Sequence, residues 1–229
     1  MRRTIIVSIS IACFALTGIA PAIARGPNVN ANRNAIYNYA KGAGAGHGKP
    51  GANLTWHGGP VQTGTPVHPI YWGASWQSSS FRGDKITGLD TFYRGIGNSS
   101  YARTNIEYSG SNGQTSAAVS FVGDAFDYSA APSRAPSTSA VLSEVAKLYP
   151  TPSADNYYPV YVDTKRGSAG YCAWHSEGSI GGVNVEFAFF FNLDGDAGCD
   201  PNDTSGLHSS GLAALANVSG HELSEALTD

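Results

Sequence analysis

Runs of β-branched and aromatic residues divide the chain into short segments that predict strands. Four of them stand out, at residues 67–72, 117–121, 158–162 and 183–191. The last is apolar at nearly every position, which is typical of a central strand buried on both faces. A Gly/Ser/Asn run at residues 109–113 predicts a hairpin turn.

Three segments have helical periodicity, at residues 84–96, 139–148 and 211–228. Ser139 is expected to cap the second helix, and Ser209 or Ser210 the third. The third is apolar nearly all round in its first half, so we expect it to run through the interior. Helices and strands in irregular order predict an α+β fold: a mixed sheet with a buried C-terminal helix.

The first 24 residues have the pattern of a signal peptide. A basic start, Met1-Arg2-Arg3, precedes an apolar run and the small-x-small pattern of residues 22–24. A membrane anchor is the alternative, but Pro21 and the small residues favour cleavage after Ala24. We therefore predict a secreted, extracellular protein with no membrane attachment after cleavage.

The mature chain divides into two parts. Residues 25–51 are rich in Gly, Ala and Asn and contain few large apolar side chains, so we expect a flexible lead-in. Residues 52–229 are long enough for a single α+β domain with a real core.

Composition narrows the range of functions. The formal net charge is −3, and loss of Arg2 and Arg3 with the signal peptide makes it −3 − 2 = −5. An acidic chain without clustered Lys and Arg is not expected to bind nucleic acid. It also contains neither a GxSxG nucleophile motif nor a Walker glycine loop.

Cleavage also removes Cys13 and leaves Cys172 and Cys199. In an oxidising compartment two cysteines are most simply one disulfide, worth about 3 kcal/mol on the loop-entropy model. A thiolate metal site is the alternative, although neither cysteine lies in a CxxC pair.

The last predicted helix carries the candidate chemistry, because His221, Glu225 and Asp229 follow one another at intervals of four residues. Side chains one turn apart can converge on one cation, and Glu222 could take a proton from water held there. The pattern is HExxE, whereas zinc peptidases have HExxH. We expect zinc, with metal ligands His221, Glu225 and Asp229 and with Glu222 as catalytic base. The harder donor set leaves calcium or manganese open, and a solvated polar helix face is the alternative to any metal.

Other candidates are weaker. His175 could be a third ligand, but a turn histidine held by the disulfide is favoured; His57 could line a site or simply pack at the start of a strand. The acidic loop Asp194–Asp203 could bind calcium, although its spacing does not fit an EF-hand and a solvated loop is the default.

Two segments resemble the EXORDIUM (phosphate-induced protein) family and its bacterial relatives. The first is Leu54-Thr-Trp-His-Gly-Gly-Pro-Val61, followed by Pro69-Ile-Tyr-Trp-Gly73 and Trp76, and the second is Ser219-Gly-His-Glu-Leu-Ser-Glu-Ala-Leu-Thr-Asp229. The resemblance implies a secreted or matrix protein linked in plants to growth, with a zincin-like HExxE segment. Relatives continue past the Thr-Asp pair, so it also implies that this chain is truncated. A third metal ligand and a further cysteine would then lie beyond Asp229.

Two functions remain, beside the alternative that the last helix is structural and that this chain has no function of its own. The first is a zinc-dependent, peptidase-type hydrolase acting on extracellular polypeptides. The second is a non-catalytic protein that binds cell-wall material, with sugars stacking on Trp56, Trp72, Trp76 or Trp174.

Overall fold

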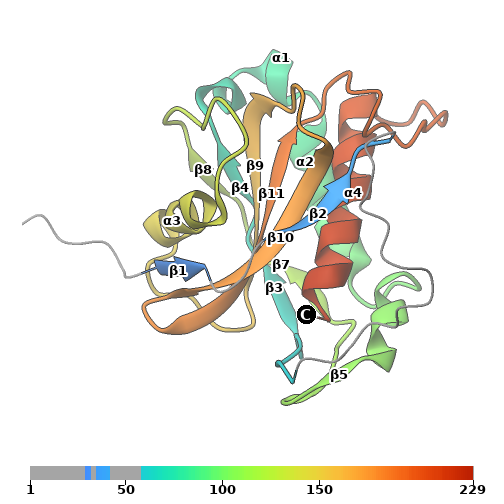
Figure 1. Cartoon of the computed structure of the whole chain (residues 1–229). Helices are drawn as coiled ribbons and strands as arrows, with labels where there is room; N and C mark the ends of the chain where they lie inside the picture. The colour runs from blue at the N-terminus through green and yellow to red at the C-terminus, as the bar shows by residue number, and fades with distance from the viewer. Residues whose placement is uncertain (1–28, 32–34, 42–57, 229) are drawn as a thin grey trace, which may run out of the picture.

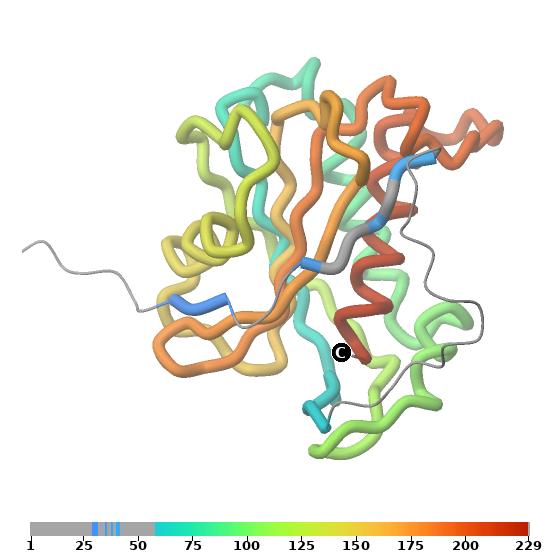
Figure 2. Tube along the Cα trace, viewed as in Figure 1, coloured from blue at the N-terminus to red at the C-terminus, as the bar shows by residue number. Residues whose placement is uncertain are grey.

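The computed structural model describes residues 29–31, 35–41 and 58–228 (Figure 1). Within them, a mixed β-sheet carries helices on both faces, so the fold is α+β as predicted. Figure 2 follows the chain through this arrangement and shows the last helix alongside the sheet.

The sheet has the strand order β1-β10-β11-β9-β3-β7, with β2 beside β10 and with β4 joining β9 to β8. β10 is antiparallel to β11, whereas β9 is parallel to β11, β3 and β4. The strands are β1 (Val29–Ala31), β2 (Ile36–Tyr39), β3 (Thr65–Val67), β4 (Ile70–Trp72), β7 (Val119–Phe121), β8 (Ala125–Asp127), β9 (Tyr157–Lys165), β10 (Tyr171–Ile180) and β11 (Val183–Asn192); β5 (Ser109–Gly110) and β6 (Gly113–Gln114) form a separate hairpin.

The helices lie on the two faces of this sheet. α4 packs on β10, β11 and α2, while α3 packs on β1, β10 and β9 (Figure 1). The α-helices are α1 (Ser79–Arg82), α2 (Lys85–Ile96), α3 (Thr138–Leu148) and α4 (Ser210–Ala226), and the 3-10 helices are η1 (Ala74–Gln77) and η2 (Ala102–Glu107). None of these described helices is long and apolar enough to cross a membrane.

Several segments differ from the prediction. The segment 25–51, expected to be a flexible lead-in, contributes β1 and β2, which pair with the two ends of β10. Short strands need few apolar residues of their own when backbone pairing with a long strand satisfies their polar groups. α3 is capped by Ser137 rather than Ser139, while α4 is capped by Ser209, one of the two expected residues. The predicted signal peptide lies outside the described residues.

Stacked aromatic side chains and three buried hydroxyl groups fix α2 and α4 to the sheet. Tyr161 of β9 stacks on Tyr71 of β4 and on Phe190 of β11, with ring centroids 5.5 and 4.6 Å apart. Its hydroxyl lies 2.7 Å from the hydroxyl of Tyr93 in α2 and 2.7 Å from that of Ser219 in α4. All of these side chains are buried. Because buried polar groups are costly to leave unpaired, this network fixes how α4 lies on the sheet.

A buried carboxyl group lies between α3 and β8. Glu144 is only 5% exposed and lies 3.6 Å from the Nζ atom of Lys147. Burial raises its pKa to about 7, and the nearby carboxyl group of Asp127 adds to the effect. Lys147 also forms an ion pair with Asp127. The folded protein therefore holds a proton on Glu144 that the unfolded chain releases at lower pH.

This proton makes stability depend on pH. A carboxyl pKa raised by folding contributes stability below its unfolded value, and that contribution is lost as the pH rises through about 7. We expect the thermal midpoint to fall by several degrees between pH 5 and pH 8 and the fall to be smaller in Glu144→Gln. Thermal unfolding followed by circular dichroism across this range measures both. Equal falls in the two proteins would contradict the assignment.

Candidate metal site

The helix that carries the HExxE motif is anchored at its start and again at Ser219. At its start, the Ser209 side chain accepts a hydrogen bond from the backbone N–H of Leu212, which caps α4. Ser209 in turn donates from its own backbone and hydroxyl group to Asp84, at 2.7 and 2.6 Å. Further along, Ser219 joins the hydroxyl network described above. Glu222 lies one turn beyond Ser219, so its direction is set by the same anchor.

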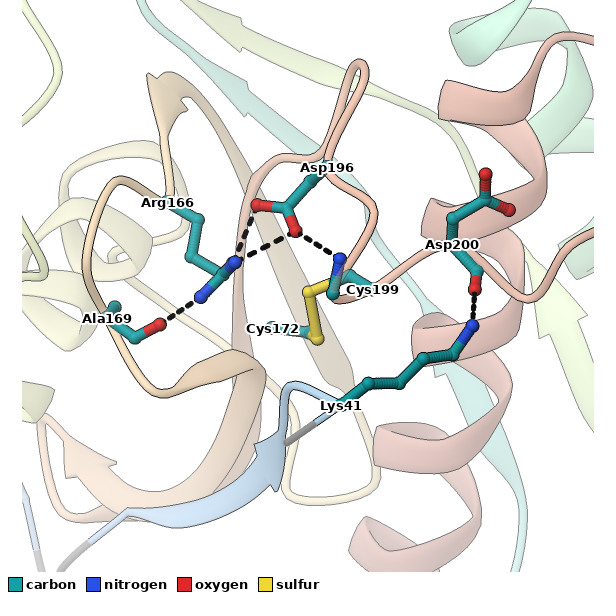
Figure 3. Close-up of a disulfide and its surroundings, with 8 residues drawn as sticks. Lys41, Arg166, Ala169, Cys172, Asp196, Cys199 and Asp200 are labelled. Carbon is teal, nitrogen blue, oxygen red and sulfur yellow. Dashed lines mark hydrogen bonds and ion pairs between the residues drawn. A yellow bond between two sulfur atoms is a disulfide. The ribbon is translucent and has the colours of Figure 1, made fainter. Parts of the chain in front are cut away.

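The opposite wall of the site is strand β10. His175 pairs with Ala188 of β11 and is 1% exposed. Near the start of the strand, Cys172 forms a disulfide with Cys199, in the loop that follows β11 (Figure 3). The predicted disulfide is therefore present, and it ties β10 to the segment that leads into α4.

Four side chains form a continuous chain of contacts between β10 and α4. The Nδ1 atom of His175 lies 2.8 Å from Oε2 of Glu222 and 3.4 Å from Oε2 of Glu225. On the far side, Oε1 of Glu225 lies 3.2 Å from Nε2 of His221. His175, Glu222 and Glu225 each offer a ligand atom within 4.8 Å of the others, and among the described residues this is the one such group of three.

The site grades from a dry interior to solvent. Glu222 is 0% exposed, whereas the side chains of Glu225 and His221 are 40% and 45% exposed. Burial raises the pKa of Glu222, and its hydrogen bond to His175 opposes that effect. The pKa of His221 is raised, mainly by its hydrogen bond to Glu225. The inner carboxylate is thus desolvated and the outer imidazole is accessible.

Three buried oxygen atoms at this site have no hydrogen-bond partner in the described part of the chain. These are Oε1 of Glu222, Oε2 of Glu225 and the hydroxyl of Tyr157, a residue of β9 that is 0% exposed. The hydroxyl lies near the charges of Glu222 and Glu225, which add to the effect of burial in raising its pKa. A buried oxygen atom without a hydrogen-bond partner destabilises the folded state. The donor set and these unpaired oxygens therefore fit a divalent cation that accepts nitrogen and oxygen ligands.

The structure separates the residues that the HExxE pattern groups together. His221 and Glu225 share one side of α4, as the four-residue spacing predicts, and that side lies at the solvent edge. Glu222 points inward to His175 and not to solvent. Asp229 and His57 lie outside the described residues.

Of the three converging residues, His175 is the one whose local structure the sequence analysis interprets incorrectly. Its interpretation as a turn residue is wrong, because it lies in the middle of the ten-residue strand β10. Tyr, Cys, Trp and Ile at other positions of that segment are a strand signal, but His, Ser, Glu and Gly interrupt the apolar pattern. Those polar residues obscure the strand, although one of them lines the site.

The acidic loop proposed for calcium has other partners for its carboxylates. Asp196 accepts hydrogen bonds from Nε and Nη2 of Arg166 at 2.6 and 2.9 Å (Figure 3). Asp194 forms an ion pair with Lys85, and Asp203 accepts hydrogen bonds from Ser205. These contacts already relieve much of the repulsion between the carboxylates. Calcium binding in this loop stays a prediction.

A cavity of about 800 Å³ lies elsewhere, between α2 and α4. Its walls include Phe92 and Leu212, with Asp84, Asp203 and His208 at one end. None of the three converging side chains lines this cavity, so the candidate metal site and the cavity are separate features of the molecule.

Comparisons of the chain with models of known families, with curated proteins and with solved structures found no match. The resemblance to the EXORDIUM family therefore rests on the two sequence segments alone.

Proposed function

We propose that this chain is a secreted, EXORDIUM-like protein in which His175, Glu222 and Glu225 hold a divalent cation, zinc above all, in a site that supports peptidase-type hydrolysis. The observation that carries the proposal is the convergence of a buried histidine from β10 with two glutamates from α4. The basic and apolar start of the chain and the disulfide support export.

The arrangement gives each residue a distinct part. His175 supplies a nitrogen donor, and Glu222 and Glu225 supply oxygen donors. The side chain of Glu222 is buried, whereas that of Glu225 is partly exposed to solvent. Zinc held by them would act as a Lewis acid toward the carbonyl group of a substrate. His221 stays outside the converging group, hydrogen-bonded to Glu225, and it presents an imidazole to whatever approaches from solvent.

The part played by Glu222 separates two versions of the site. The HExxE pattern predicts a base that acts on water, and a base must be reached by that water. Glu222 is 0% exposed and lies 2.8 Å from His175, which favours a ligand role. A ligand contributes to metal affinity, whereas a base contributes to turnover and leaves metal affinity intact.

The test is metal binding and proteolysis by the same preparation. Wild-type protein and Glu222→Gln are stripped of metal, titrated by calorimetry with zinc, manganese and calcium in turn, and incubated with an unfolded casein substrate. We expect zinc binding and cleavage by the wild type, and loss of both in Glu222→Gln. No binding of zinc, manganese or calcium by the wild type would overturn the proposal; binding without cleavage would leave the metal site and remove the hydrolase.

The alternative function, binding of cell-wall material through tryptophans, receives less support. Trp76 and Trp174 are each 1% exposed, so neither can stack on a sugar. Trp72 is half-buried, and its indole N–H donates to the hydroxyl of Ser129 at 3.3 Å. Trp56 lies outside the described residues.

A further inference from the structure

A second group of side chains lies across the sheet from the metal site, at strand β8. The strand order from β10 through β11, β9 and β4 to β8 separates the two places by the width of the sheet (Figure 1). Phe126 of β8 and Tyr128 just after it are 37% and 44% exposed. Their rings stack with centroids 5.8 Å apart and planes 30° apart. Two large aromatic rings thus present one surface to solvent.

The exposed rings of Phe126 and Tyr128 are supported by a buried aromatic side chain. Phe126 also stacks on Tyr71, with ring centroids 5.3 Å apart and planes 23° apart. Tyr71 is 0% exposed and belongs to the stack that runs through Tyr161 to Phe190. The exposed rings are therefore the outer end of a rigid aromatic column, and a ligand that stacks on them loses little side-chain freedom.

A pair of carboxyl groups adjoins the same column. Asp90 of α2 and Asp124, two residues before Phe126, lie close enough for the pKa of each carboxyl group to depend on the other. Burial raises the pKa of Asp124 to about 7, and the charge of Asp90 adds to the effect. One oxygen of each carboxyl group, Oδ1, is buried and has no partner in the described chain. The hydroxyl of Tyr71 is also buried without a hydrogen-bond partner in the described chain, and it lies near the carboxyl groups of Asp124 and Asp90.

These features select a kind of ligand. An anion would be repelled by the carboxyl pair, and Arg94 already supplies positive charge to both carboxyl groups. A neutral ring with several hydroxyl groups needs no charge of either sign, because a carboxyl group whose pKa is raised can hold a proton and then both donate and accept hydrogen bonds. Its C–H face matches the exposed aromatic rings, which bind apolar surfaces without requiring charge.

We infer that Phe126 and Tyr128, with the Asp90–Asp124 pair beside them, form a binding site for neutral sugar rings. The site is independent of the cation proposed between β10 and α4. It uses phenylalanine and tyrosine at the β8 edge of the sheet and none of the four tryptophans.

The inference is tested with three neutral oligosaccharides: cellohexaose, xylohexaose and chitohexaose. Binding is measured by calorimetry for the wild type, Tyr128→Ala, Phe126→Ala and Asp124→Asn. Tyr108→Ala is the matched control, because Tyr108 is 43% exposed and follows η2, away from β8. We expect at least one sugar to bind the wild type and Tyr108→Ala equally, and Tyr128→Ala to bind it at least 10-fold more weakly.

Tyr128→Ala decides the matter if Phe126→Ala fails to fold, since Tyr128 does not stack on the buried Tyr71. Near-ultraviolet circular dichroism and the thermal midpoint establish that each variant is folded. Absence of binding to all three sugars by the wild type would overturn the inference, as would wild-type affinity in folded Tyr128→Ala. Neither outcome bears on zinc binding, so failure here is distinguishable from failure of the proposed function.

Discussion

Replacement of His175 by alanine is expected to lower zinc affinity by more than about 100-fold, because even groups that only support a metal ligand typically account for 10- to 100-fold. His175 is the one donor from β10, and it contacts both glutamates of α4. Its loss removes a ligand and leaves the buried Glu222 carboxylate without its hydrogen-bond partner. Calorimetric titration with zinc measures the effect.

His208→Ala is the matched control for this prediction. His208 belongs to the loop before α4, where its Nδ1 atom lies 3.2 Å from Asp203, and it is not a member of the converging group. Its replacement should leave zinc affinity unchanged. His175→Gln keeps a polar side chain beside Glu222 and covers the case in which the alanine variant is unstable. Wild-type affinity in a folded His175 variant would contradict the ligand assignment.

Replacement of Gly97 by alanine is expected to destabilise the protein by about 3 kcal/mol, the upper end of the usual range for overpacking. Gly97 follows the last residue of α2, and a Cβ atom there would lie 2.2 Å from the backbone oxygen of Val119. A backbone oxygen in β7 cannot move without disturbing the sheet. The thermal midpoint should fall by about 6–12 °C.

Gly95→Ala provides the opposite result in the same helix. A Cβ atom at Gly95 would have no neighbour within 4 Å, and alanine stabilises a helix by about 1 kcal/mol relative to glycine. The midpoint of this variant should therefore rise by a few degrees. Equal behaviour of the two variants would mean that α2 does not approach β7 as described.

The sequence predicts those elements whose local signals agree with their tertiary role. The 183–191 run, apolar at nearly every position, becomes the central strand β11, and the capped periodic segment after Ser209 becomes α4. The 67–72 run is divided into β3 and β4. These segments bury apolar side chains, so the pattern and the packing coincide.

The inner half of the candidate site could not be predicted in the same way. Helical periodicity assigns Glu222 to the polar side of α4, and its burial follows only from the position of β10 against that helix. His175 lies 47 residues earlier, and the pairing of β10 with β11 brings it to Glu222. Buried polar residues break the apolar pattern of a strand, so no strand is predicted at residues 171–180, where β10 carries the site.

The most direct measurement is anomalous diffraction at the zinc absorption edge from crystals of the metal-loaded protein. The account predicts a peak in contact with His175, Glu222 and Glu225, with ligand atoms at about 2.0–2.2 Å from the ion. A zinc-loaded crystal with no peak between β10 and α4 would contradict it.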